Sequence, residues 1–293
     1  YSIVEVQAPY GYVLNSEPVY FDVTQDGSAE ESGITVIEGV RSNMAQKGTI
    51  TVSKSGEVFT SVSENNGMYQ PVFAVQGLEG AVYEITASEN IYTLDGTLRA
   101  SKGEVVDTIT TGTDGTAKSK ELYLGKYEVK EITAPYGMVL NDEIHAVELV
   151  YAGQEIEVTE TSTSFYNERQ RVEIDLIKSL EADEAYGVGN NGEIFDVTFG
   201  LFARADRTAA NGTVIPADGL IEIISLDENG KGTVNSDLPF GSYYVKELSR
   251  SEGYELSVGN RKAPFTNAGQ ELEASAGTER EGYAVITKGL YAE

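Results

Sequence analysis

The sequence predicts an all-β chain made of tandem antiparallel β-sandwiches stacked end to end. Short stretches alternate between apolar and polar residues and are separated by turn dipeptides, and two phrases of the sequence recur at a fixed spacing. Alternation is typical of strands with one buried face, and recurrence indicates homologous units. Short strands with frequent turns favour an antiparallel sandwich.

The expected strands follow one another along the whole chain. Alternation covers residues 48–53, 81–86, 127–130, 147–150, 221–225 and 243–246. Hairpin-type dipeptides lie between them: Asp95-Gly96, Asp114-Gly115, Asn211-Gly212 and Asn229-Gly230. No long stretch has a helical period with caps at both ends, so residues 180–186 are expected to form one helical turn at most.

The recurring phrases define the domain boundaries. Asn43 precedes Lys54 by 11 residues, and Asn167 precedes Lys178 by the same 11 residues. A second phrase, at residues 1–15, matches residues 127–141 and, more loosely, 243–256. The repeats predict three segments: the C-terminal part of a unit at 1–46, a complete unit at 47–170, and another at 171–293, truncated at or near its last strand. The segments that connect the units contain no Gly/Ser-rich or Pro-rich linker, which favours restricted movement of one unit relative to the next.

Composition excludes several classes of partner. The chain has no cysteine and no tryptophan, and its formal net charge is −26. So acidic a surface repels nucleic-acid backbones and anionic lipids. No apolar run reaches the length of a membrane span, and we expect any signal peptide or anchor to lie outside this stretch. If the protein is extracellular, it withstands that environment without disulfides, which leaves room for another kind of cross-link.

The residues at the repeat ends resemble a known family. The lysine on the first strand, the glutamate in a Tyr-x-Val-Lys-Glu-x-x-Ala-Pro-x-Gly-Tyr context and the asparagine near the last strand resemble the B-type domain of the Cna protein. This is a prealbumin-like, immunoglobulin-like sandwich of Gram-positive adhesins and pilins. The resemblance implies an intramolecular Lys–Asn isopeptide bond promoted by the glutamate. Carried over, it assigns Lys54, Glu131 and Asn167 to the complete unit, Lys178 and Glu247 to the last, and Glu5 and Asn43 to the first.

General chemistry agrees with this assignment. A lysine attacks an amide only as a neutral amine, and burial lowers a lysine pKa while raising that of a carboxyl group. The carboxylic acid can polarise the amide carbonyl and relay a proton to the departing ammonia. The alternative is an edge-strand lysine, a solvated glutamate and a turn asparagine. The ordered recurrence, and the register that puts Lys54 on one face with Ile50 and Val52, favour the cross-link.

The last unit departs from the pattern because its acceptor is missing. The spacing of 36 to 38 residues from glutamate to asparagine leads from Glu247 to residues 283–285, which include no asparagine. Alignment of the final residues places the acceptor position at Glu293 or just beyond, and Asn267 lies in a turn context. We predict no metal and no cofactor: His145 is the sole histidine, and residues 227–232 are expected to form a hairpin turn and not a calcium loop.

These features predict a structural stalk or shaft segment of a cell-wall-anchored, extracellular surface protein, with neighbouring repeats of the same chain as its partners. The alternative is a module that binds a host extracellular protein or a glycan through the loops of one sandwich. An exposed aromatic patch confined to one unit would favour that alternative. An enzyme is not expected, since a triad that reacts once with its own chain does not turn over.

Overall fold

The computed structural model describes residues 1–23, 39–180, 182, 184, 189–251, 261–265 and 283–291, the last two ranges as backbone strands. The chain divides into two compact units. The N-terminal unit comprises residues 1–54, 78–133 and 141–165, and the C-terminal unit comprises residues 55–77, 134–140 and 166–293. The predicted all-β class is confirmed, because helical structure among the described residues is limited to the short 3-10 helix η1 (Glu193–Asp196).

The N-terminal unit is built mostly from short strands. These are β1 (Ser2–Ile3), β2 (Val19–Tyr20), the first part of β3 (Lys47–Asn65), β5 (Val82–Ala87), β6 (Ile91–Tyr92), β7 (Leu98–Ala100), β8 (Val105–Thr110), β9 (Thr116–Lys118), β10 (Leu122–Tyr123), β11 (Gly125–Thr133), β12 (Ile144–Leu149) and most of β13 (Val158–Asn167).

The core of this unit lies between two groups of strands. One is the antiparallel sheet β12-β11-β5-β8, and in the other β3 pairs with β9, β10 and β13. Their inward side chains form one hydrophobic cluster that includes Ile50, Val52, Tyr83, Ile85, Tyr127, Val129 and Phe165. Every second residue of β11 is buried from Tyr127 to Glu131, so Glu131 occupies a core position in the period-2 pattern.

The C-terminal unit has a core of the same kind. Its strands are β4 (Met68–Gly77), β14 (Arg171–Ser179), β15 (Thr198–Ala203), β16 (Arg207–Thr208), β17 (Val214–Ile215), β18 (Leu220–Ser225), β19 (Lys231–Thr233), β20 (Gly241–Ser249), β21 (Arg261–Phe265) and β22 (Tyr283–Tyr291). Strands β4, β18, β15, β20 and β21 follow one another in one sheet, and β19, β14 and β22 form another. Buried side chains of β14, β15, β18 and β20 make the core.

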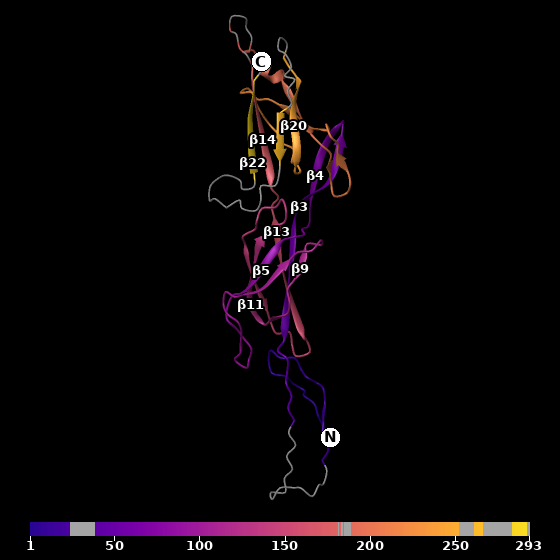
Figure 1. Cartoon of the computed structure of the whole chain (residues 1–293), viewed down its shortest axis with the longest axis vertical. Coiled ribbons are helices and arrows are strands. Elements are labelled where there is room, and N and C mark those ends of the chain that lie inside the picture. Colours follow the sequence, from indigo (N-terminus) through magenta and orange to yellow (C-terminus); the bar gives the residue numbers. More distant parts are fainter. Residues whose placement is uncertain are drawn as a thin grey trace. The chain divides into compact units, whose positions relative to one another are not determined.

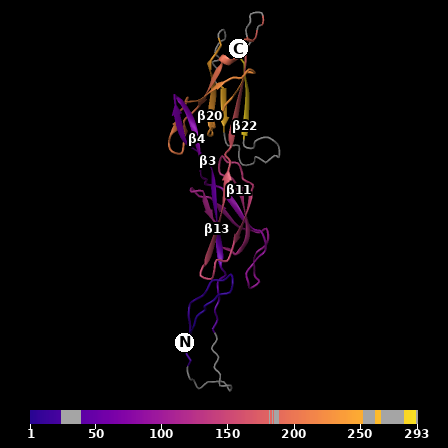
Figure 2. The same cartoon turned by 180° about the vertical axis from the view of Figure 1, so that it is seen from behind.

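A β-hairpin from the first half of the sequence completes this core. Strand β3 continues beyond Lys54, turns at Asn66-Gly67, where both residues have positive φ (52° and 76°), and returns as β4 beside it (Figures 1 and 2). Two positive φ values are what a tight hairpin turn requires, and Asn-Gly adopts them readily. Phe59, Val62 and Tyr69 of the hairpin pack against the core of the C-terminal unit.

The predicted turns and strands are largely confirmed. The glycines of the four predicted turn dipeptides, Gly96, Gly115, Gly212 and Gly230, all have positive φ. The six predicted strands fall on β3, β5, β11, β12, β18 and β20. Residue 81 lies one position before β5 and residue 150 one position after β12, and the other strand ends reach or pass the predicted bounds, by 12 residues at the end of β3. The predicted helical turn at 180–186 lies partly outside the described residues, and η1 was not predicted.

The sheets are not antiparallel throughout. Strand β22 pairs with β14 in parallel, with Arg171 opposite Tyr283 and Ser179 opposite Tyr291. A parallel pair needs a long crossover between its strands, and here most of a repeat lies between the two. Local alternation predicts a strand but not its direction, which is why the sequence predicted antiparallel pairing alone.

The repeated Ala-Pro-Tyr-Gly phrase forms the same corner in both copies. In each, the residue after the glycine donates its backbone N–H to the proline carbonyl, at 3.1 Å for Tyr12 and 3.0 Å for Met138. The glycine carbonyls of Gly11 and Gly137 accept from the backbone N–H of Gln46 and Gln170 at 2.8 Å. The sequence repeat is therefore a structural repeat at these corners.

Candidate functional site: buried lysine–glutamate pairs

Lys54 and Glu131 form a buried pair in the N-terminal unit. Lys54 shares the buried face of β3 with Ile50 and Val52, as the alternation predicted. Its Nζ lies 3.3 Å from Glu131 Oε1, and both side chains have no exposed surface. The structure thus brings two predicted site residues together from β3 and β11, strands on opposite sides of the core.

The surroundings favour an uncharged lysine. Burial lowers the pKa of Lys54 from its ordinary value of 10.5, although the charge of Glu131 opposes this shift. The Lys54 Nζ also lies 5.8 Å from the centroid of the Phe165 ring. A lysine whose pKa is lowered by desolvation has a larger fraction of the nucleophilic neutral amine at neutral pH.

The Glu131 carboxylate is held by a backbone donor and faces a tyrosine. Its Oε2 accepts a hydrogen bond from the backbone N–H of Asn141 at 2.8 Å. Tyr83 lies directly opposite Glu131 in the β5–β11 pair, and burial together with the Glu131 charge raises the pKa of Tyr83. Neither Asn141 nor Tyr83 is among the site residues that the sequence predicts. Asn141 could have been suspected because it matches Asn15 in the repeated phrase.

A second pair occupies the corresponding place in the C-terminal unit. Lys178 Nζ lies 3.2 Å from Glu247 Oε2, and each side chain is 2% exposed. Lys178 is on the buried face of β14, and Glu247 is on that of β20. The residue opposite Glu247 is Phe199, where the first pair has Tyr83.

The first predicted segment also brings its two site residues together. Asn43 Nδ2 donates a hydrogen bond to Glu5 Oε2 at 2.7 Å and another to the Val13 carbonyl at 2.9 Å. Glu5 Oε2 further accepts from the backbone N–H of Asn15 at 2.9 Å. This contact repeats the Asn141 contact to Glu131, so both glutamates accept from the backbone N–H of the asparagine that ends the repeated phrase at 1–15 and 127–141.

The acceptor positions differ between the units. Asn167 is the last residue of β13, is buried, and belongs to a strand that pairs with β3. In the C-terminal unit the parallel register places Leu290 opposite Lys178. The acceptor position predicted at Glu293, and the rejected candidate Asn267, lie outside the described residues.

Other candidate chemistry is sparse in the part of the chain that the structure describes. His145 stacks on Phe165 at 3.9 Å and its Nδ1 lies 2.7 Å from Thr163 Oγ1. The described residues contain no cluster of three or more histidine, cysteine or acidic residues suited to a metal ion. The turn at 227–232 is closed by Asp227, whose Oδ1 accepts from the backbone N–H groups of Asn229 and Lys231 and whose backbone carbonyl accepts from that of Gly230. No described helix is long and apolar enough to cross a membrane.

Comparison with known proteins identifies the fold of the middle segment. The family model of the SpaA prealbumin-like fold domain matches residues 74–164. The TIE protein of Bacillus anthracis is similar in structure, with a TM-score of 0.50 and 19% identity. The match covers 85% of this chain and 35% of the TIE protein chain. This chain therefore spans about a third of that protein, and the likeness shows the fold alone.

Two further solved structures have lower scores. A streptococcal ancillary pilin has a TM-score of 0.29 and 18% identity. The match covers 98% of this chain and 74% of the pilin chain. A C-terminal fragment of the pilus adhesin SpaC from Lactobacillus rhamnosus GG has a TM-score of 0.40 and 11% identity. The match covers 85% of this chain and 98% of the SpaC fragment. None of the curated proteins matches the sequence. The match of residues 74–164 to the SpaA prealbumin-like fold domain confirms the resemblance to prealbumin-like sandwiches that the sequence predicted.

Proposed function

We propose that the chain is a shaft or stalk segment of a Gram-positive cell-surface pilin or adhesin, stabilised by a self-formed Lys54–Asn167 isopeptide bond. The observation that carries the proposal is the fully buried pair of Lys54 and Glu131, with 3.3 Å between Nζ and Oε1. A buried ion pair by itself adds little stability, because desolvation offsets the attraction. A reactive amine beside a proton acceptor explains such a pair better.

The reaction needs no cofactor. Neutral Lys54 Nζ attacks Cγ of Asn167, a new C–N bond forms, the bond to the side-chain amide nitrogen breaks, and ammonia leaves. The Glu131 carboxyl group polarises the Asn167 carbonyl and relays the proton: it gives one proton to the leaving nitrogen and takes one from the attacking amine. Holding the groups in a folded core raises their effective concentration to about 10⁵ M or more for a well-oriented pair. The reaction occurs once per chain and is not enzymatic turnover.

The bond would suit a protein that carries tension. Lys54 lies on β3 and Asn167 ends β13, so a bond between them ties the start of the proposed complete unit (47–170) to its end. Force then passes through the tie and not through the intervening chain. The proposed partial unit (1–46) and last unit (171–293) would lengthen the stalk with further repeats of the same kind. A protein with this role would lie outside the cell and be anchored to the cell wall. The partners of each unit would be the neighbouring repeats of the same chain.

The intact mass of the purified chain tests the proposal. We expect a mass lower than that calculated from the sequence by one molecule of ammonia, and a tryptic cross-linked peptide that contains Lys54 and Asn167. Lys54→Arg should restore the calculated mass. Lys178→Arg is the matched control, since its unit has no asparagine at the predicted acceptor position, and it should leave the deficit unchanged. An unmodified wild-type mass would falsify the bond.

A further inference from the structure

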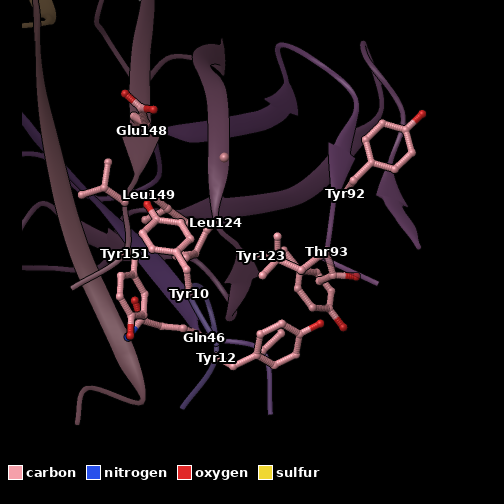
Figure 3. A pocket seen from close by; sticks show the side chains of 15 residues that line it. Tyr10, Tyr12, Gln46, Tyr92, Thr93, Tyr123, Leu124, Glu148, Leu149 and Tyr151 are labelled. Carbon is pink, nitrogen blue, oxygen red and sulfur yellow. The ribbon is translucent and has the colours of Figure 1, made fainter. Parts of the chain in front are cut away.

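A cavity of about 480 Å³ lies in the N-terminal unit, and neither Lys54 nor Glu131 lines it. Five tyrosines border it, from four segments of the chain: Tyr10, Tyr12, Tyr92, Tyr123 and Tyr151 (Figure 3). Its size falls within the range of about 300–1,000 Å³ that is common for small-molecule sites.

Several of these rings are fixed before any ligand arrives. Tyr10 and Tyr151 pack against each other with 4.6 Å between ring centroids. Arg99 Cζ lies 4.8 Å from the centroid of the Tyr123 ring, and Lys47 Nζ lies 5.6 Å from it. In Figure 3 the Tyr10–Tyr151 pair lies at one side of the cavity and Tyr92 at the other. Rings held in place lower the entropic cost of binding.

Two of the tyrosines keep exposed ring surface, and three keep a hydroxyl group without a hydrogen-bond partner among the described residues. Tyr10 is 69% exposed and Tyr92 is 57% exposed. Within the described residues, no hydrogen bond uses the hydroxyls of Tyr10, Tyr12 or Tyr151. Together the tyrosines therefore offer a ligand apolar ring faces and hydroxyl groups that can donate or accept a hydrogen bond.

The corresponding corner of the C-terminal unit provides an internal comparison. There the cavity beside Tyr136 and Gly137 measures about 170 Å³. The Phe240 ring lies against Gly137 and meets Tyr136 edge-on at 5.6 Å. Arg169, buried and paired with Glu57, also lines that cavity.

Three substitutions distinguish the open cavity from the closed one. The alignment of the repeats places Leu124 where the other copy has Phe240, Ala45 where it has Arg169, and Tyr12 where it has Met138. Leu124 and Ala45 are smaller than Phe240 and Arg169, which leaves room at the open cavity, and Tyr12 adds a tyrosine to its lining. Since the closed copy forms the same corner, the open and tyrosine-rich form is not a requirement of the fold.

Charge limits the ligands that the cavity can accept. Glu148 is the charged residue among the described residues that line it, and the chain carries a net charge of −26. The net negative charge repels an anionic ligand during its approach. The two cations beside the Tyr123 ring are each paired with an acidic residue, Arg99 with Asp95 and Lys47 with Glu121. The lining suits a neutral ligand with apolar faces and many hydroxyl groups.

We propose that this tyrosine-lined cavity binds a neutral oligosaccharide. A pyranose ring presents a face of C–H groups, which stacks on the exposed rings of Tyr10 and Tyr92, and hydroxyls at its edge, which bond to tyrosine hydroxyls. Glu148 accepts from sugar hydroxyls at the rim. A proline-rich peptide also docks on aromatic grooves, but its prolines have no N–H to donate to Glu148.

Binding can be measured on the full chain. The probes are lactose, maltotriose, N-acetyllactosamine and triacetylchitotriose, with 3′-sialyllactose as the anionic counterpart of lactose and a proline-rich decapeptide as the competing class. Calorimetry supplies the affinity, and a change in tyrosine fluorescence that is lost in the cavity variants assigns the signal to the cavity, since the chain has 18 tyrosines and no tryptophan. We expect at least one neutral sugar to bind with a Kd of about 1 mM or lower. If lactose is the sugar that binds, 3′-sialyllactose should bind more weakly than lactose.

Variants locate the site. Tyr10→Ala combined with Tyr92→Ala should weaken sugar binding at least about tenfold, through the loss of two stacked rings. Tyr136→Ala is the matched control: Tyr136 is 74% exposed at the corresponding corner, and its loss should leave binding unchanged. Unchanged circular dichroism establishes that the double variant is folded. The proposal is overturned if no neutral sugar binds, if the double variant binds as well as wild type, or if only the peptide binds.

Discussion

Lys54 Nζ lies 3.3 Å from Glu131 Oε1 inside the N-terminal unit, with neither side chain exposed. The same arrangement recurs in the C-terminal unit, at 3.2 Å between Lys178 and Glu247. Buried lysine and glutamate are rare unless they are paired, and burying both charges is costly. That the arrangement occurs twice, at corresponding positions of two cores, supports a shared chemical role.

Glu131→Gln should stop bond formation while the chain still folds. Glutamine keeps the size of the side chain but cannot take the proton of the attacking amine. We expect the purified variant to retain its full calculated mass. Glu128→Gln, on the same strand but exposed, is the control and should lose ammonia as wild type does. Normal loss of ammonia in the Glu131 variant would show that the proton relay is assigned to the wrong residue.

The stability of a chain without the bond should depend on pH through Lys54. In Asn167→Ala the bond cannot form, and the folded state holds Lys54 with a pKa lowered from 10.5 by burial. The unfolded state then binds the proton at higher pH than the folded state does. Stability should rise as pH increases from the lowered pKa toward 10.5 and level off above it.

The wild-type chain is the reference for this measurement. Its Lys54 nitrogen would be an amide that does not titrate, whereas other ionisable groups are shared with the variant. Urea unfolding of both chains from about pH 7 upward gives the difference in free energy. Curves that stay parallel over the whole range would contradict the predicted role of Lys54.

The two repeated corners should respond differently to the same substitution. Gly11 and Gly137 have φ values of 81° and 80°, so alanine should cost about 1–2 kcal/mol at either position. At Gly137 the new Cβ would also clash with Phe240 Cε2, whereas at Gly11 it meets nothing within 4 Å. Gly137→Ala should therefore cost about 1–3 kcal/mol more than Gly11→Ala. Equal losses in urea unfolding would mean that Phe240 moves aside freely.

Under heat, force or protease, the proposed unit 47–170 should outlast residues 171–293. A covalent tie between Lys54 and Asn167 restricts the unfolded chain, and by analogy with a disulfide that closes a loop of similar length it contributes roughly 4–5 kcal/mol. Limited proteolysis followed by mass spectrometry should show the first cuts after residue 170. In pulling experiments the chain between residues 54 and 167 should not extend. Its full extension would count against the shaft and favour ligand binding as the function.

The sequence by itself determined the all-β class, the positions of the main strands and the faces of the key side chains. Alternation has a period of two, so Ile50, Val52 and Lys54 had to share one face of a strand. The repeated phrases likewise paired equivalent residues, such as Asn15 with Asn141, whose backbone N–H groups bind Glu5 and Glu131 in the same way. The predicted boundaries and the isopeptide bond stay predictions.

Only the tertiary structure decided which faces meet. The hairpin at residues 55–77 packs into the C-terminal unit, although its sequence belongs to the proposed unit 47–170. The parallel pairing of β14 with β22 and the tyrosine-lined cavity likewise depend on residues far apart in the chain. Local sequence patterns indicate which face of each strand is apolar. Which distant strand covers that face depends on how all the side chains of the core pack together.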